Sequence, residues 1–326
     1  MKNTNKVSKI PVLGFTLVAV ITLVALFALS TTACSGGGGG KSLNSATELK
    51  EYLDKQPANS PDKPIKVAMK VNDMIINDVT TVLRRSDKYV SLNLSGSPLT
   101  KFPDAFRQLK TLVGITIPDS VTSIGDLAFS GTSLTSITIP AGVTSISNGA
   151  FSGCTSLTAI TVDGKNPAYA SEGGIVYNKA KTEIVAVPQG ISGTVTLPAS
   201  VTSIGDSAFY DCTGLTGITI PAGVTSIGNQ TFRNCTGLAS ITIPASVTSI
   251  GTQAFNGCDS LTAITIPAGV TTMGMSVFGD WTASQTINVQ GHASQAAADA
   301  AWGGRWWRGA VFGDGSTKAT INYQGK

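Results

Sequence analysis

A segment of about 23 residues recurs through most of this chain, and this repetition limits the folds that the chain can adopt. The clearest copy is Leu238–Ser260, which reads LASITIPASVTSIGTQAFNGCDS. Similar copies lie at Leu215–Gly237 and Leu134–Ser156. A tandem repeat of this length predicts a solenoid, in which each copy forms one coil and stacked coils share a core.

Each coil is predicted to begin with a short strand. Ile241 and Ile243 alternate with threonine and therefore point to one face of that strand. Pro244 ends the strand, because proline has no N–H to donate to a sheet. Ile250 then turns inward, and a short helical or 3₁₀ turn on the outer side is expected around Phe255.

The spacing L-x-x-I-x-I…V-x-x-I…A-F is typical of a leucine-rich repeat, a class with roughly 20–29 residues per copy. The expected fold is an α/β solenoid, rich in β structure, with one continuous parallel sheet and short helical turns on the other side. The array is predicted to cover residues 89–291, with a hairpin insertion at 164–193.

The array is flanked by segments that do not repeat. Residues 45–88 are predicted to cap its N-terminal end, since the apolar end of a solenoid must be covered. Within them, Ser45 and Glu48 have capping-box spacing and predict the start of a helix. Residues 292–326 are predicted to form a Trp-rich C-terminal cap.

Residues 1–33 are predicted to be a lipoprotein-type signal peptide. Three lysines precede an apolar run, Ile10–Leu29, and small residues then lead to Cys34. This arrangement resembles a bacterial lipobox, in which the cysteine becomes lipidated. Residues 34–44 then form a Gly-rich tether. An ordinary signal peptidase site and an uncleaved membrane helix are the alternatives.

Four further cysteines occupy one position of the repeat: Cys154, Cys212, Cys235 and Cys258. An exported protein could join them as disulfides. The sequence favours the other interpretation, a row of small buried thiols, because a cysteine that recurs at one position of a repeat usually serves packing.

The insertion predicts a β-hairpin around a polar turn at Asn178–Thr182. It concentrates charge in an array that otherwise has little. Its role is either a binding loop or a hairpin packed on one edge. The candidate contact residues of the binding loop are Tyr177, Lys179, Lys181 and Glu183.

The side chains between the inward isoleucines should form an exposed ladder on the sheet. The ladder consists of threonine and very small residues and lacks the aromatic and arginine anchors that usually dominate interface energy. The candidate binding residues on this face are Ser136, Thr138, Thr161, Thr196, Thr219, Ser240, Thr242 and Thr265.

The residue types argue against an enzyme. His292 is the only histidine, and we expect it to be exposed in a loop after the last strand. No recurring carboxylate pair and no phosphate-binding loop appear, so no catalytic residue, metal or cofactor is predicted. A net charge of +4 gives no case for nucleic-acid binding.

All four tryptophans lie near the C-terminal end of the chain, at Trp281, Trp302, Trp306 and Trp307. A C-terminal cap is the favoured interpretation of this cluster. Because tryptophans and neighbouring arginines can stack on sugars, a glycan-binding surface is the alternative.

The residues SITIPAGVTSIG, followed by A-F-x-G-C-T-S-L, closely resemble the BspA-like leucine-rich-repeat proteins with treponemal-type repeats. The resemblance covers Tyr89–Val289 and includes the insertion. It implies a curved right-handed superhelix with the parallel sheet on its concave side. It also implies a bacterial surface protein that adheres to host matrix proteins, host cells or other bacteria.

The predicted function is therefore that of a non-enzymatic adhesin. Its partner is a protein, and its N-terminal lipid attaches it to the bacterial membrane, with the outer membrane as the expected location. A structural spacer without a ligand and a glycan-binding protein are the alternatives.

Overall fold

The computed structural model describes residues 43–147, 149–303 and 319–325. Residues Lys41–Lys326 form one compact unit, which contains every described core side chain. We therefore expect this unit to fold without the segment before it. Residues 1–33, which the sequence predicts to be a signal peptide, and Cys34 lie outside the described residues. No described helix combines the length and the apolarity needed to cross a bilayer.

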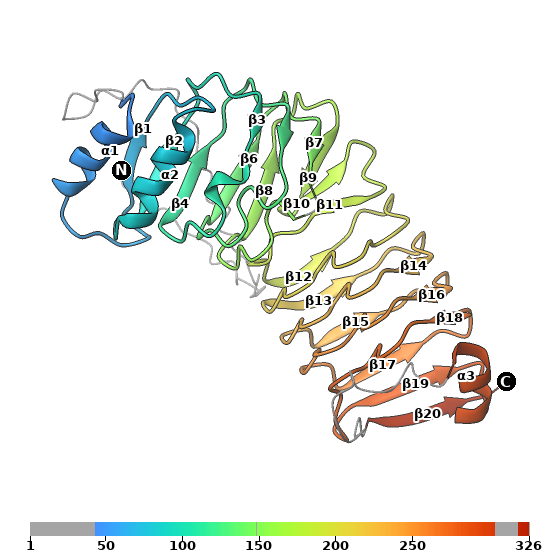
Figure 1. Ribbon diagram of the computed structural model, residues 1–326. Helices are drawn as coiled ribbons and strands as arrows, with labels where there is room; N and C mark the ends of the chain where they lie inside the picture. The colour runs from blue at the N-terminus through green and yellow to red at the C-terminus, as the bar shows by residue number, and fades with distance from the viewer. Residues whose placement is uncertain (1–42, 148, 304–318, 326) are drawn as a thin grey trace, which may run out of the picture. The chain divides into compact units, whose positions relative to one another are not determined.

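The unit is a solenoid whose coils carry parallel strands, as the repeat predicts (Figure 1). One strand per coil belongs to a set that we call the first ladder. Its members are β1 (Ile65–Ala68), β2 (Val90–Asn93), β4 (Leu112–Thr116), β6 (Ser136–Ile139), β8 (Ala159–Val162), β12 (Gly193–Thr196), β13 (Leu215–Thr219), β15 (Ser240–Thr242), β17 (Ala263–Ile266), β19 (Thr286–Gln290) and β20 (Thr320–Gln324).

The first ladder has the predicted alternation of side chains. In register, Ile218 lies beside Ile241 and Thr219 beside Thr242. The isoleucines pack on the core, and the threonines are exposed. The β-branched residues of each copy therefore build one rung of this ladder.

A second parallel ladder, which the sequence did not predict, follows the proline bend. Its two-residue strands are β3 (Lys101–Phe102), β5 (Ser123–Ile124), β7 (Ser145–Ile146), β14 (Ser226–Ile227), β16 (Ser249–Ile250) and β18 (Thr272–Met273). Ile227 lies beside Ile250, which lies beside Met273. The inward turn predicted at Ile250 is therefore a strand that pairs with the neighbouring coils.

The third side of each coil holds a buried phenylalanine. Phe232 and Phe255 stack with their ring centroids 5.5 Å apart, and Phe255 and Phe278 lie 5.9 Å apart. The predicted helical turn is a 3₁₀ helix only at η1 (Asp104–Phe106) among the described residues, and elsewhere this side is formed by hydrogen-bonded turns. One reason is that residues beside the phenylalanines adopt left-handed φ, as Gln253 does at +56° and Gly257 at +69°.

The four described cysteines are buried free thiols, as the packing interpretation predicted. The Sγ of Cys235 donates a hydrogen bond to the Phe209 carbonyl at 3.0 Å, and that of Cys258 donates to the Phe232 carbonyl at 3.1 Å. Each thiol thus satisfies a buried carbonyl of the preceding coil.

The insertion forms a three-stranded antiparallel sheet instead of a two-stranded hairpin. Its strands are β9 (Tyr169–Glu172), β10 (Ile175–Asn178) and β11 (Ile184–Ala186), with β10 in the middle. Successive side chains of β10 point in opposite directions. Val176 packs in the core of the N-terminal coils, whereas Ile175 and Tyr177 pack in the core of the C-terminal coils. Strand β10 is therefore a wall between two cores.

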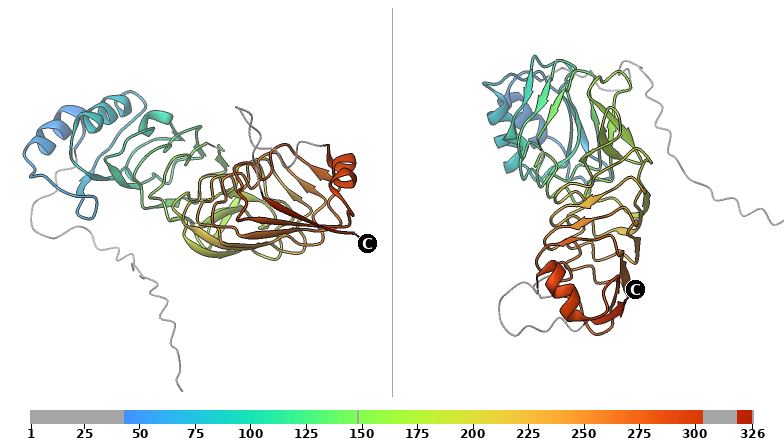
Figure 2. Two further views of the ribbon diagram at one scale, coloured as in Figure 1. Left: turned by 90° about the horizontal axis from the view of Figure 1, so that it is seen from below. Right: turned by 90° about the vertical axis from the view of Figure 1, so that its right-hand side faces the viewer.

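Helices lie at both ends of the stack, α1 and α2 at one and α3 at the other (Figure 2). Helix α1 (Ala46–Asp54) begins as predicted, because Ser45 Oγ accepts a hydrogen bond from the Glu48 N–H at 3.1 Å. Helix α2 (Ile76–Arg85) follows a turn in which Asn72 Oδ1 accepts hydrogen bonds from the Met74 and Ile75 N–H groups.

Helix α3 (Gln295–Trp302) buries Trp302, whose Nε1 donates to the Val270 carbonyl at 3.0 Å. Trp281 is also buried, and its Nε1 donates to the Phe255 carbonyl at 2.9 Å. His292 is half-buried against the Trp302 ring, so the expectation that it is exposed was wrong.

Candidate functional site

The exposed side chains of the first ladder form a surface that we call the threonine face. All eight residues predicted for it are exposed: Ser136, Thr138, Thr161, Thr196, Thr219, Ser240, Thr242 and Thr265. Neighbouring rungs align, and the hydroxyls of Thr138 and Thr161 lie 2.9 Å apart, within hydrogen-bond distance.

The first ladder is interrupted, although the repeat predicted a continuous sheet. Strand β15 pairs with β13, and β17 pairs with β19, but β15 and β17 do not pair. Within the described part of the chain, no backbone hydrogen bond joins these two strands. The second ladder remains paired beside the interruption, through β16 and β18, so the opening is confined to the threonine face.

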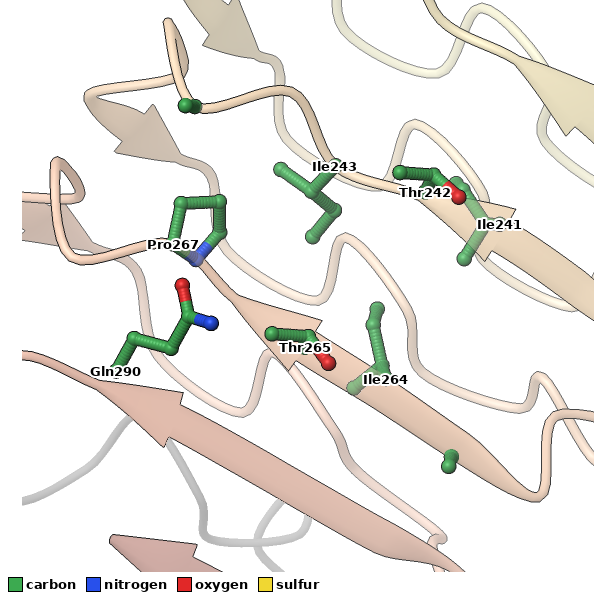
Figure 3. Close-up of a pocket in the computed structure, with 9 residues that line it drawn as sticks. Ile241, Thr242, Ile243, Ile264, Thr265, Pro267 and Gln290 are labelled. Carbon is green, nitrogen blue, oxygen red and sulfur yellow. The ribbon is translucent and has the colours of Figure 1, made fainter. Parts of the chain in front are cut away.

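A cleft of about 320 Å³ lies at this interruption (Figure 3). Strand β15 supplies Ile241 and Thr242, and β17 supplies Ile264 and Thr265. Ile241 is only half-buried, whereas its neighbour Ile218 in the paired part of the ladder is buried. The missing pairing therefore leaves Ile241 partly exposed in the cleft. Strands β4 and β6 are also unpaired with each other, and Ile115 on β4 is likewise half-buried. The remaining lining residues are Ile243, Ala245, Ala263, Pro267 and Gln290.

Gln290 is a lining residue that the sequence reasoning missed. The pairing of Ile266 with Val289 places Gln290 beside Pro267, at the position where other coils have a proline. Its amide extends from β19 toward Pro267 (Figure 3). The signal in the sequence was the replacement of this repeated proline by a residue that can donate and accept hydrogen bonds.

The cleft can bind a neutral group, but it has no groups for acid–base chemistry. Its side chains offer two threonine hydroxyls and one amide above walls of isoleucine and proline. No titratable side chain lines it. Nor do the described residues contain a cluster of three or more histidine, cysteine or acidic side chains suited to a metal ion.

The two lysines of the hairpin turn bond to other residues of the insertion. Lys179 Nζ donates to the Asn166 carbonyl at 2.6 Å, and Lys181 forms an ion pair with Glu172. Glu183 is exposed, and its backbone forms an isolated parallel β-bridge with Ser203 in the next coil. Including Tyr177 in a binding loop was wrong, because only 1% of this residue is exposed and its ring fills the core.

The tryptophans divide into two pairs. Trp281 and Trp302 are buried and cannot stack on a glycan in the folded protein. Trp306 and Trp307 lie outside the described residues.

Comparison with known proteins agrees with this geometry. Residues 91–188 and 189–300 match the BspA type leucine rich repeat region, in six copies. Among solved structures, a leucine rich cell surface protein from Faecalibacterium prausnitzii is 27% identical, with a TM-score of 0.55. The alignment covers 73% of this chain and 64% of that protein, so less than two thirds of the relative is represented here.

The pneumococcal vaccine antigen PcpA is 15% identical, with a TM-score of 0.53 and 82% of each chain covered, a likeness that concerns the fold alone. No curated protein matches this sequence. The repeat model spans most of the solenoid, and proteins of this class are typically exported, bind other proteins and have no enzymatic activity. The chain belongs to the BspA-type leucine-rich-repeat family.

Proposed function

We propose that this protein is a cell-surface adhesin that binds a protein partner through the threonine face, with the β15–β17 cleft as the anchoring point. The partner belongs to the host extracellular matrix, the host cell surface or the surface of other bacteria. The observation that carries the proposal is the cleft, because a face of threonine and small residues is otherwise without anchors.

The size and chemistry of the cleft support this role. At about 320 Å³ it is near the lower end of ligand pockets, and it suits one or two side chains of a partner. Apolar walls provide burial, while Thr242, Thr265 and Gln290 provide oriented hydrogen bonds. A partner that inserts a neutral or aromatic side chain here would gain the kind of anchor that dominates interface energy.

We further propose that lipidation of Cys34 holds the protein on the outer membrane, with the glycine-rich segment as a flexible tether. This anchoring agrees with a family of exported surface proteins. It would leave the solenoid free to meet large partners.

The test is a binding screen with residues 35–326 against purified matrix proteins and bacterial surfaces, measured by surface plasmon resonance. In a Thr242→Lys/Thr265→Lys variant, two long charged side chains obstruct the cleft, and we expect the affinity for the partner to fall at least tenfold. Thr196→Lys is the matched control, because it adds a lysine to the same face at a described position outside the cleft.

Equal loss in both variants would assign binding to the whole face and not to the cleft. Uniformly weak binding to every partner would contradict the adhesin proposal and favour the spacer. The two lysine variants should unfold at the same temperature as the wild type, since the replaced threonines are exposed.

A further inference from the structure

Strand β20 is the outermost strand of the first ladder at the C-terminal end of the stack (Figure 1). The Thr320 N–H donates to the Gln285 carbonyl at 2.9 Å, and the Gln324 carbonyl accepts from the Gly291 N–H at 2.9 Å. Thr320, Asn322 and Gln324 therefore direct their backbone groups toward β19. Because this direction alternates along a strand, the N–H and C=O groups of Ile321 and Tyr323 point outward.

No described residue pairs with this outer edge. The strand also lacks the usual protection of an edge, since it contains no charge, proline or glycine. Ile321 and Tyr323 are only half-buried, and the Tyr323 hydroxyl is buried without a hydrogen-bond partner among the described residues. Among the described residues, the end of the ladder thus has backbone groups without hydrogen-bond partners and partly exposed apolar surface.

The opposite end of the ladder is protected. Beyond β1, the Leu43 N–H donates to the Ala68 carbonyl at 3.2 Å, and the Leu43 carbonyl accepts from the Lys70 N–H at 3.4 Å. Strand β1 also carries an exposed lysine, Lys66. Both are known means of preventing edge-to-edge pairing. The contrast identifies β20 as the edge that can accept another strand.

We propose that β20 pairs with β20 of a second copy of this chain, antiparallel and centred on Asn322. The sequence Thr-Ile-Asn-Tyr-Gln suits this arrangement. The outward backbone groups of Ile321 meet those of Tyr323 in the partner and form hydrogen-bonded pairs, two at each position. Asn322 meets its own copy at the non-hydrogen-bonded position on the two-fold axis.

The side chains match on both faces of this pairing. On the core side, each Ile321 lies opposite a Tyr323, a β-branched and aromatic pair that stabilises antiparallel strands. On the exposed side, Thr320 lies opposite Gln324, and the two Asn322 amides can bond to each other. The dimer would join the two β17–β19–β20 sheets into one and place the β15–β17 cleft close to the new interface, because only β19 separates β17 from β20 and Gln290, which lines the cleft, lies beside Gln324.

The pairing is tested by cross-linking residues 35–326 that carry Asn322→Cys. Antiparallel partners at the non-hydrogen-bonded position have Cα atoms about 4.5 Å apart, within the range that a disulfide spans. We expect mild oxidation to convert most of this variant to a covalent dimer. Thr320→Cys is the matched control on the same face, because its thiol lies opposite Gln324 and too far from its own copy.

The native cysteines do not interfere, since they are buried in the fold. Comparable cross-linking of both variants would show random collision and overturn the proposal, as would the absence of cross-linking from both. Rapid cross-linking of Thr320→Cys alone would indicate a parallel or shifted pairing and would also overturn it.

Sedimentation provides a second test without oxidation. In Asn322→Lys, two like charges face each other on the axis, and we expect the dimer dissociation constant to rise at least tenfold, less so at high salt. Thr116→Lys on β4 is the control, because it adds a lysine at an exposed position of the same ladder that is remote from β20. A wild-type protein that stays monomeric at tens of micromolar would refute the proposal.

Discussion

At the scale of single residues, one repeat position donates a hydrogen bond to a carbonyl of the preceding coil, and this carbonyl usually belongs to a phenylalanine. Cys235 and Cys258 do this with a thiol, and Trp281 does it with an indole N–H. The donor must be buried, so small or apolar donors are suitable and charged ones are not. This explains why a cysteine recurs at this position without forming a disulfide.

Because the thiols are buried in the folded protein, alkali deprotonates them more readily in the unfolded state. It raises the pKa of Cys235 from 9.0 to about 12, and it also raises the pKa of Cys258. Above pH 9 the unfolded chain loses thiol protons that the folded chain retains. The unfolded state then binds fewer protons, so the free energy of unfolding falls as pH rises toward the folded pKa.

We predict that Cys235→Ala reduces this fall by about 1.4 kcal/mol per pH unit between pH 9.5 and 11. Urea unfolding at several pH values, with a reductant present, measures it. Thr236→Ala, which changes an exposed neighbour, should leave the slope as in the wild type. An unchanged slope in Cys235→Ala would show that this thiol does not titrate as its burial requires.

Residues with a left-handed backbone conformation (positive φ) are a second feature at this scale. Gly257 has a φ of +69°, and a Cβ there would lie 2.8 Å from Asn234 Oδ1. We predict that Gly257→Ala lowers the free energy of unfolding by about 1–2 kcal/mol, the usual cost of an L-residue in this region. Thermal unfolding followed by circular dichroism measures the change.

The converse change should stabilise the protein. Ser207 is exposed and has a φ of +56°, so Ser207→Gly relieves strain, and we expect a gain of about 0.5–1 kcal/mol. Ser152→Gly is the control, since Ser152 is also exposed but is not left-handed. A loss of stability in both variants would contradict this account of the turn.

At the scale of elements, the insertion shows why a surface pattern can mislead. Its charges suggested a binding loop, but its central strand is buried on both sides. We predict that Tyr177→Ala lowers the free energy of unfolding by about 3–5 kcal/mol, as for other large aromatic residues removed from a core.

The same element provides a test of its role in binding. Replacing Asn178–Thr182 with a two-residue turn removes Lys179 and Lys181, and it keeps β11 and all of β10 except its last residue. On our proposal this variant binds the partner with unchanged affinity in the plasmon resonance assay. A lost signal with an intact fold would return Lys179 and Lys181 to the binding surface.

The elements also show which features can be predicted from the sequence. The first ladder was predicted because Ile241 and Ile243 alternate with threonine. The second was missed because a strand of two residues, such as Ser249–Ile250, is too short for any periodic signal. Strand β9 has no apolar alternation either, and it exists because β10 offers an edge to pair with.

At the scale of the whole molecule, β10 separates two cores that the repeat alone would have merged. We predict that Val176→Ala speeds hydrogen exchange mainly in the N-terminal coils, and that Ile175→Ala does so in the C-terminal coils. Mass-spectrometric exchange on this matched pair measures the effect. Equal acceleration on both sides in each variant would mean that the cores unfold as one.

The candidate site was predicted only in part at this scale. The threonine face follows from one strand of the repeat, and all eight of its residues are exposed as expected. The cleft depends on a missing pairing between two strands of almost identical sequence, Ser240–Thr242 and Ala263–Ile266. Such a break is a property of the stack, so no single copy reveals it.

The register of the coils has an evolutionary consequence. Because Gly217 lies beside Ser240, and Ser226 beside Ser249, each coil meets the next through the same positions of its copy. A gene duplication of one whole copy would therefore add a coil that fits between its neighbours without altering their contacts. Lineages could lengthen or shorten this surface by recombination. The coil that carries β10 would keep its place, because β10 packs between two different cores.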